Sequence, residues 1–111
     1  MKPVRFIRSA KEDLAAFPKS VRSRAGQELF MLQAGRNPDN WKPMPTIGAG
    51  ACEIRVRDEA GAFRVIYVAK FEEAVYVLHA FQKKTQKTSH IDLELAKVRY
   101  RLASEYRKGG R

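Results

Sequence analysis

The sequence predicts one α+β domain, in which a small antiparallel sheet packs against an N-terminal helical hairpin and one C-terminal helix, in the order β-α-α-β-β-β-α. Apolar residues recur every three or four positions near both ends of the chain, as they do in helices. Between residues 51 and 83 they alternate or run together, and the links are short, which is typical of antiparallel strands. A length of 111 residues suits a single domain, 1–111.

The predicted N-terminal elements are a short strand and two helices. Val4 to Arg8 alternates apolar and charged residues, as an exposed strand does. The segment Ser9-Ala10-Lys11-Glu12 has a capping-box pattern that predicts the start of a helix, and Pro18 ends this helix. The second helix has an apolar side with spacings of four, four and three residues, formed by Val21, Ala25, Leu29 and Leu32.

A loop rich in glycine and proline, residues 35–50, separates the helices from the sheet. No long regular element is expected there, and Trp41, Met44 and Ile47 are expected to anchor the loop to the core. Trp41 has an alternative role, because an aromatic ring in a loop can stack on an unpaired base.

Three strands are predicted after the loop, at Ala51 to Arg57, Phe63 to Lys70 and Ala74 to Lys83. Their links are too short for a crossover helix, so the strands should form an antiparallel meander.

A final helix is predicted to begin near Ser89, where Asp92 completes a capping pattern three residues later. Its expected buried face consists of Ile91, Leu95, Val98 and Leu102. Beyond Tyr106, the tail 107–111 is expected to be frayed.

The charge balance points to a polyanion or an acidic protein as the partner. The chain has 22 Lys and Arg against 12 Asp and Glu, a net charge of +10 at pH 7. The single cysteine, Cys52, cannot form an internal disulfide, and it is expected to be a small buried residue rather than a nucleophile. With no apolar signal segment and no run of membrane-spanning length, a cytoplasmic protein without membrane contact is predicted.

Alternation along the strands places several arginines on one face of the sheet. Arg55 and Arg57 share a face of the first meander strand with Glu53, and Arg64 projects from the neighbouring strand. Such a face could simply be solvated. Arg64, however, lies in an otherwise apolar run from Phe63 to Ala69, so it needs an anionic partner, either in the protein or in a ligand.

The segment from Lys83 to Thr88 joins the last strand to the last helix and carries three lysines. Its cations and hydroxyls lie near a helix N-terminus, which also attracts anions, so phosphate is a suitable ligand, although a solvated loop would look the same. Of the two histidines, His79 in a strand is expected to be a hydrogen-bonded core residue. His90, beside the cationic loop, is the better placed acid or base.

Several classes of enzyme lose support. The chain lacks Cys and His pairs at zinc spacing, paired carboxylates in an apolar setting, a G-x-S-x-G motif and a glycine-rich nucleotide loop. What remains is a site of arginines and lysines that needs no metal and no cofactor.

Three runs of residues carry a family resemblance: Cys52-Glu53-Ile54-Arg55-Val56, Phe63-Arg64-Val65-Ile66-Tyr67, and Leu78 to Thr88 with the sequence LHAFQKKTQKT. Together they resemble the phage Gp49-like, HigB-type branch of the RelE/ParE toxin superfamily, over about residues 1 to 105. The resemblance implies a RelE-like fold and the toxin of a type II toxin-antitoxin system. Such a toxin is a metal-independent endoribonuclease that cuts mRNA in the ribosomal A site and inhibits translation and growth.

The resemblance also implies partners and site residues. The partner would be a helix-turn-helix (HigA-like) antitoxin, through which the complex would bind operator DNA. Arg64 corresponds to the phosphate-binding arginine, Lys84 to a basic residue that ends the last strand, and Arg55 with Arg57 to a basic pair. The predicted catalytic residues are Arg64, Lys84 and His90, and the predicted substrate-binding residues are Arg55, Arg57, Lys83, Lys87 and Lys70.

In the implied reaction, the ribose 2'-OH attacks the adjacent phosphate, which requires a base, an acid and cations. The proton carrier is either a lysine whose pKa like charges lower, or His90. Two alternatives stay open: a ParE-like gyrase-inhibiting toxin without nuclease activity, and a non-catalytic RNA-binding module.

Overall fold

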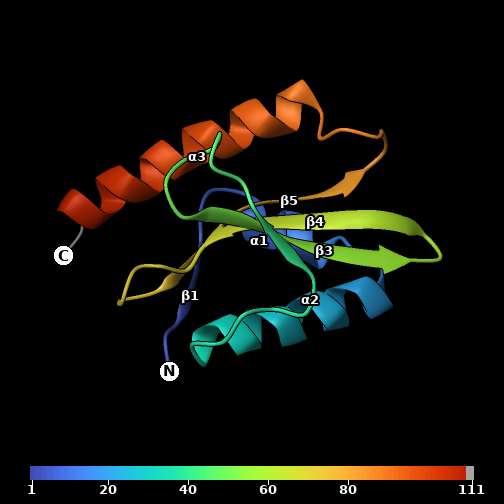
Figure 1. Cartoon of the computed structure of the whole chain (residues 1–111), viewed down its shortest axis with the longest axis horizontal. Helices are drawn as coiled ribbons and strands as arrows, with labels where there is room; N and C mark the ends of the chain where they lie inside the picture. The colour runs from blue at the N-terminus through green and yellow to red at the C-terminus, as the bar shows by residue number, and fades with distance from the viewer. Residues whose placement is uncertain (110–111) are drawn as a thin grey trace.

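The computed structural model describes residues 1–109, which form a five-stranded sheet with helices on both faces. In chain order the elements are β1 (Val4–Phe6), α1 (Ala10–Ala15), α2 (Lys19–Gln33), β2 (Trp41–Pro43), β3 (Ala51–Asp58), β4 (Gly61–Val68), β5 (Val75–Lys83) and α3 (His90–Gly109). The sheet lies between α2 and α3 (Figure 1). The predicted α+β class and the RelE-like order of elements are confirmed, with one additional strand, β2.

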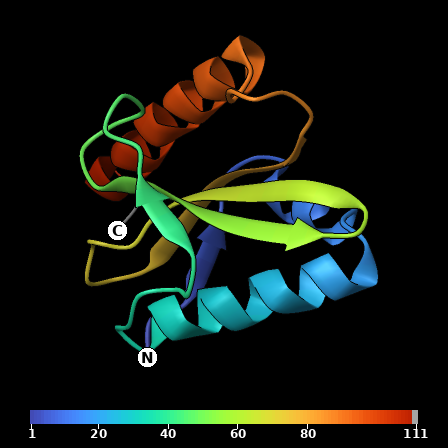
Figure 2. The ribbon, with the colours of Figure 1, turned by 45° about the vertical axis from the view of Figure 1, so that its right-hand side comes forward.

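The strand order across the sheet is β1-β5-β4-β3-β2. β3, β4 and β5 form the predicted antiparallel meander, and β2 adds an antiparallel edge to β3. β1 pairs in parallel with β5, through Val4 to Phe6 beside Val75 to Val77, so the sheet is mixed rather than wholly antiparallel. Figure 1 shows the β3–β4 hairpin reaching past the start of α2, and in Figure 2 the end of the hairpin lies above that start.

One face of the sheet packs against α1 and α2. The predicted apolar side of α2 is confirmed, because Val21, Ala25, Leu29 and Leu32 are all buried. They share a core with the apolar set of the meander, Ile54, Val56, Phe63, Val65 and Tyr67. Each fully buried side chain of this size stabilises the fold by about 1.5–3 kcal/mol.

The opposite face packs against α3, but not through the helix face that the sequence predicts. Ala96, Arg99 and Ala103 are the buried residues of α3, whereas Ile91 is 78% exposed and Val98 is 42% exposed. The small alanine side chains let the helix approach the sheet closely, and Arg99 reaches polar partners below it. An arginine within the buried face hides that face from a search for apolar periodicity.

The predicted frayed tail is wrong for residues 107–109, because α3 continues to Gly109. Arg107 forms an ion pair with Glu73, and its guanidinium lies 3.6 Å from the centre of the Phe71 ring. These contacts hold the last turn of the helix against the link between β4 and β5. Residues 110–111 of the predicted tail lie outside the described residues.

The loop of residues 35–50 contains the extra strand. In β2, Trp41 pairs with Ile54, and its side chain is 37% exposed. Trp41 therefore lies on the α2 face of the sheet, whereas Lys42 beside it lies on the α3 face. The predicted anchoring by Met44 and Ile47 is confirmed, since both pack against the core under α3.

The two capping predictions have different outcomes. Ser9 makes no side-chain cap, because its hydroxyl instead donates to the Asp13 carboxylate at 2.9 Å. At the start of α3, the Asp92 N–H donates to the Ser89 hydroxyl oxygen at 3.1 Å, as predicted. No helix within residues 1–109 is both long and apolar enough to cross a membrane.

Candidate functional site

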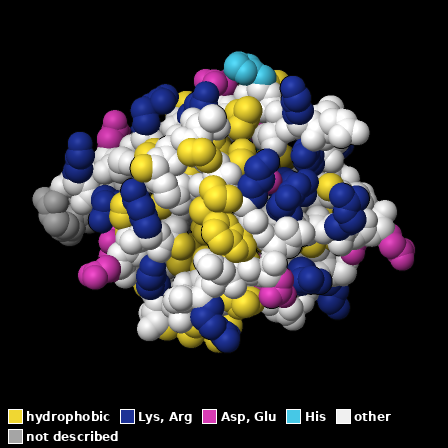
Figure 3. All heavy atoms as spheres, in the orientation of Figure 1, with side chains coloured by type: hydrophobic (Ala, Val, Ile, Leu, Met, Phe, Trp, Pro, Cys, Tyr) yellow, Lys and Arg dark blue, Asp and Glu magenta, His cyan; other side chains and the backbone are white. Residues whose placement is uncertain are grey.

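Cationic side chains from four strands meet on the part of the α3 face that α3 leaves open. Pairing places Arg55 opposite Arg64, and it places Lys42 opposite Glu53. Ala62 pairs with both Arg57 and Lys83, which brings these two onto the same face. We call this set the cation cluster: Lys42, Arg55, Arg57, Arg64 and Lys83. Figure 3 shows Lys and Arg side chains gathered to the right of the centre, with an acidic side chain between them.

Glu53 is the anionic partner that Arg64 requires. Both side chains are buried, with Glu53 3% and Arg64 5% exposed. The Glu53 Oε1 atom lies 3.4 Å from Arg64 Nε and 3.6 Å from Arg55 Nε. One carboxylate therefore offsets the charge of two arginines, which leaves the cluster strongly positive.

The hydrogen-bonding capacity of Arg64 is largely unused. Its Nη1 atom donates to the Phe63 carbonyl at 3.0 Å. Its Nε atom and the Oε2 atom of Glu53 are buried, and neither has a hydrogen-bond partner among residues 1–109. A guanidinium has five N–H donors, and leaving them unpaired in a buried position is costly. Arg64 is therefore held in place by the protein, with part of its hydrogen-bonding capacity unused.

Burial and like charges act together on the cluster. Burial lowers the pKa of Arg64, and the charges of Arg55 and Arg57 lower it further, while Glu53 opposes them. Burial also lowers the pKa of Lys83, and Arg64, Arg55 and Lys42 add to the effect. The crowding of positive charge favours binding of a polyanion and makes Lys83 easier to deprotonate than an ordinary lysine.

The structure brings Lys83, rather than Lys84, next to Arg64. Lys83 is the last residue of β5, and Lys84 follows it on the surface. Lys84 lines a neighbouring cavity of about 220 Å³ together with Phe81, Gln82, Lys83, Thr85, Ser89 and Asp92. Lys84 thus lies at the rim of the cation cluster. Lys87 is exposed in the same loop, where its carbonyl accepts a hydrogen bond from the Thr85 hydroxyl.

His79 anchors the start of α3 to the sheet. Its Nε2 atom lies 2.7 Å from the Asp92 carboxylate, and the other oxygen of Asp92 accepts a hydrogen bond from the Ser89 hydroxyl at 2.6 Å. His79 is 5% exposed and stacks on Phe81. The prediction of a hydrogen-bonded core histidine is confirmed, and the contact positions the loop that carries Lys84 and Lys87.

Two predicted site residues lie apart from the cluster. His90 is exposed at the first position of α3, and none of its side-chain contacts within residues 1–109 joins it to the cations. Lys70 follows the far end of β4 from Arg64, and its ammonium lies 5.2 Å from the centre of the Phe71 ring. Across the described chain, no group of three or more His, Cys, Asp or Glu side chains could hold a metal ion.

The sequence did not identify Glu53 and Lys42 as members of the site. Glu53 shares the alternation of Arg55, which is a usable signal, but alternation alone does not show which arginine the carboxylate pairs with. Lys42 could not be placed, because its loop contained no pattern that predicted β2. Burial raises the pKa of the Cys52 thiol, which fits an unreactive residue.

Comparison with known proteins agrees with the resemblance found in the sequence. The model of the family described as phage derived protein Gp49-like (DUF891) matches residues 12–101, which include every strand except β1. A search of curated proteins gave no match.

Proposed function

Because the chain belongs to the phage-derived Gp49-like protein family, we propose that it is a toxin of the toxin-antitoxin type and that its cation cluster cleaves mRNA on the ribosome. The observation that carries the proposal is the state of Arg64. This arginine is 5% exposed and held by Glu53, its buried Nε atom has no hydrogen-bond partner within residues 1–109, and it lies on a face with Arg55 and Lys83.

The cluster contains the groups that metal-independent RNA cleavage requires. In that reaction the 2'-oxygen bonds to phosphorus, its proton passes to a base, and the bond from phosphorus to the 5'-oxygen breaks. The 5'-oxygen then takes up a proton, which leaves a 2',3'-cyclic phosphate and a 5'-hydroxyl. Negative charge grows on the phosphate oxygens, so preorganised cations lower the barrier.

We assign the roles from position and charge. Arg64 and Arg55 bind the scissile phosphate, Lys42 and Arg57 add positive charge, and Lys84 at the rim binds the RNA backbone. Lys83 is the proton carrier, because burial and its cationic neighbours lower its pKa. His90 is exposed at the start of α3, so it is the second candidate for this role.

The proposed partners follow from the same features. Ribosomal mRNA is a polyanion, which is the kind of partner that a net charge of +10 favours. A protein that acts on this mRNA would be cytoplasmic. Control would come from a helix-turn-helix antitoxin, which would also carry the complex to operator DNA. A reading frame for such a protein next to this one is a simple first observation.

Purified protein incubated with ribosomes and a defined mRNA tests the activity, with new 5' ends mapped by primer extension. Cleavage on ribosomes is expected, and Arg55→Ala should lower its rate about 10-fold or more. This loss is smaller than the 10²–10³-fold expected on removal of a fully desolvated donor, because Arg55 is partly exposed. Arg24→Ala is the matched control, because it removes the same charge from the exposed side of α2.

Parallel reactions distinguish the alternatives. Intact mRNA together with gyrase-dependent breaks in supercoiled DNA would establish the ParE-like alternative. RNA binding without new 5' ends, and without growth arrest on expression, would establish a non-catalytic module.

A further inference from the structure

The outer face of α3 carries an apolar seam formed by Ile91, Leu95, Val98 and Leu102. These residues are spaced by four, three and four, and Tyr106 continues the line one turn later. Ile91 is 78%, Val98 42% and Tyr106 47% exposed, while Leu95 and Leu102 are half-buried. Spacing of four and three is how one helix packs along another, so the face matches a helical partner.

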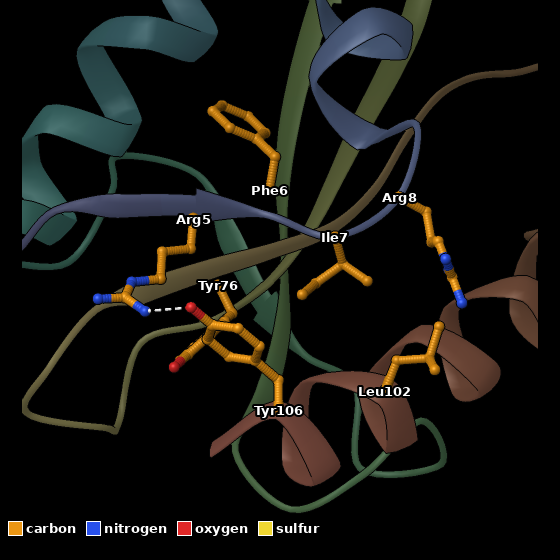
Figure 4. A pocket seen from close by; sticks show the side chains of 7 residues that line it. All are labelled: Arg5, Phe6, Ile7, Arg8, Tyr76, Leu102 and Tyr106. Carbon is orange, nitrogen blue, oxygen red and sulfur yellow. Dashed lines mark hydrogen bonds between the residues drawn. The ribbon is translucent and has the colours of Figure 1, made fainter. Parts of the chain in front are cut away.

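At its C-terminal end the seam opens into a pocket of about 450 Å³ between α3 and the chain around β1. The pocket is lined by Arg5, Phe6, Ile7, Arg8, Tyr76, Leu102 and Tyr106. Figure 4 shows Ile7 and Leu102 pointing toward one another across it, with the two tyrosines at one end. The pocket is large enough to take apolar side chains from a partner.

Two arginines flank this pocket, and neither forms an ion pair with an acidic group within residues 1–109. The Arg5 Nη1 atom donates to the Tyr106 hydroxyl at 2.8 Å (Figure 4). Arg8 is exposed, and Figure 4 shows its side chain reaching toward α3 beside Leu102. An acidic partner would neutralise both charges.

The backbone of Arg8 is also unusual. Its φ is 53°, and it is the one residue other than glycine within residues 1–109 with a positive φ. A side chain with a Cβ atom is disfavoured in this conformation, which glycine would adopt easily. Such strain tends to occur at functional positions, so an arginine here suggests that its charge has a use.

We propose that the apolar seam and the pocket bind an amphipathic helix of a partner protein, with acidic residues of that helix facing Arg5 and Arg8. A second copy of this chain is disfavoured, because each copy has a net charge of +10 and would bring the same arginines to the contact. The proposal for this surface is independent of the proposed RNA cleavage. Two strands, β5 and β4, separate β1 from β3, where Arg55 lies.

A synthetic three-heptad peptide is the probe, with leucine at its a and d positions and glutamate at the flanking positions. Its binding to the full-length protein is followed by fluorescence anisotropy. The matched probe has lysine in place of each glutamate. We expect saturable binding of the glutamate peptide and about tenfold weaker binding, or none, for the lysine peptide.

Three variants locate the site. Val98→Glu puts a charge into the seam and should weaken binding of the glutamate peptide about tenfold or more. Arg8→Gly should weaken it several-fold while the protein becomes no less stable, because glycine relieves the backbone strain. Phe30→Glu is the control and should bind as the parent does, because Phe30 is an exposed apolar residue on α2.

Three outcomes would overturn the proposal. Equal binding of both peptides would show that acidic residues are not required in the partner. Absence of binding would show that the surface does not bind an amphipathic helix. A dimer in sedimentation experiments that Val98→Glu dissociates would show that a second copy occupies the surface. Because mRNA cleavage is measured separately on each variant, failure here is distinguishable from failure of the proposed function.

Discussion

Arg64 and Arg99 are both buried arginines on the α3 side of the sheet, yet their surroundings differ. Arg64 is 5% and Arg99 6% exposed, and burial lowers the pKa of each. Arg99 donates to the Leu78 carbonyl at 3.0 Å and to the Ser9 hydroxyl at 2.8 Å. It thereby joins α3 to β5 and to the start of α1, whereas within residues 1–109 the one hydrogen bond of Arg64 is to its own neighbour, Phe63.

We propose that this difference separates a structural arginine from one that binds an anion. The donors of Arg99 bind groups from separate parts of the chain, so its removal would take a donor from the carbonyl of the buried Leu78. Arg64 is fixed by an ion pair to Glu53, and positive charges surround it. The Nε atoms of both arginines are buried without a hydrogen-bond partner within residues 1–109. We therefore infer that burial shows only that an arginine is important, and that the groups around it show its role.

Exchange of each arginine for lysine should give the largest difference, which is a difference in the rate of mRNA cleavage. Lysine keeps the charge but loses the planar set of donors, so Arg64→Lys should lower the rate of ribosomal mRNA cleavage by about 10²–10³-fold. Arg99→Lys should leave the rate per folded molecule unchanged. The measurement is cleavage normalised to the folded fraction from circular dichroism, and equal losses in both variants would remove the distinction.

Removal of the side chains makes the same contrast in stability. Arg99→Leu should lower the free energy of unfolding by about 2–4 kcal/mol, because the Leu78 carbonyl and the Ser9 hydroxyl lose their donor. The double variant Glu53→Leu with Arg64→Leu removes both charges of a buried pair, and it should change stability by only about 1 kcal/mol or raise it. Urea unfolding measures both, and a large loss in the double variant would make Arg64 structural.

A neutral partner for Arg64 should reveal the anion site. Glu53→Gln removes the carboxylate that offsets the charge of Arg64, so the folded protein should become less stable and bind anions more tightly. Inorganic phosphate should therefore raise the melting temperature of Glu53→Gln more than that of the parent. Chloride at equal ionic strength is the control, because general screening would produce the same rise with either salt.

The sequence predicted the position of Arg64 but not that of Arg99. Alternation along β3 and β4 placed Arg55 and Arg64 on one face, because period-two patterns survive in a strand whatever packs above it. Arg99 was missed, because the predicted face of α3 was the exposed seam from Ile91 to Leu102. The burial of Arg99 depends on oxygens of Leu78 and Ser9, which are distant in the chain, so no local pattern encodes it.

Glu53 illustrates the same limit at the candidate site. Its residue type and face were predictable, but its role as the partner of Arg64 depends on the pairing register of β3 and β4. The order of elements was predictable because turns and periodicity are local. The identity of the lysine nearest to Arg64 was not predictable, because it depends on where β5 ends, at Lys83 and not at Lys84.

Lys83 allows the crowding around Arg64 to be measured through pH. Its pKa in the folded protein is lowered from 10.5, so the unfolded chain binds more protons in the interval below that value. The lysine therefore destabilises the fold at neutral pH, and the penalty shrinks as pH rises through its folded pKa toward 10.5. The stability advantage of Lys83→Met over the parent should fall over this interval, and a constant difference would contradict the shift.

Arg107 adds a third arginine to the comparison, with the smallest expected effect, because it is exposed and donates to Glu73 through Nε and Nη2. Its hydrogen bond lowers the pKa of Glu73 to about 2, and the Tyr76 hydroxyl contributes at 3.0 Å. A lowered carboxyl pKa adds stability above pH 4.5 that is lost as pH falls toward 2. Arg107→Ala should return the pKa of Glu73 toward 4.5 in an NMR titration, whereas Lys97→Ala, which removes the same charge from α3, should not. If the pKa of Glu73 stayed near 2 without Arg107, the lowering would come from Tyr76 and not from the arginine.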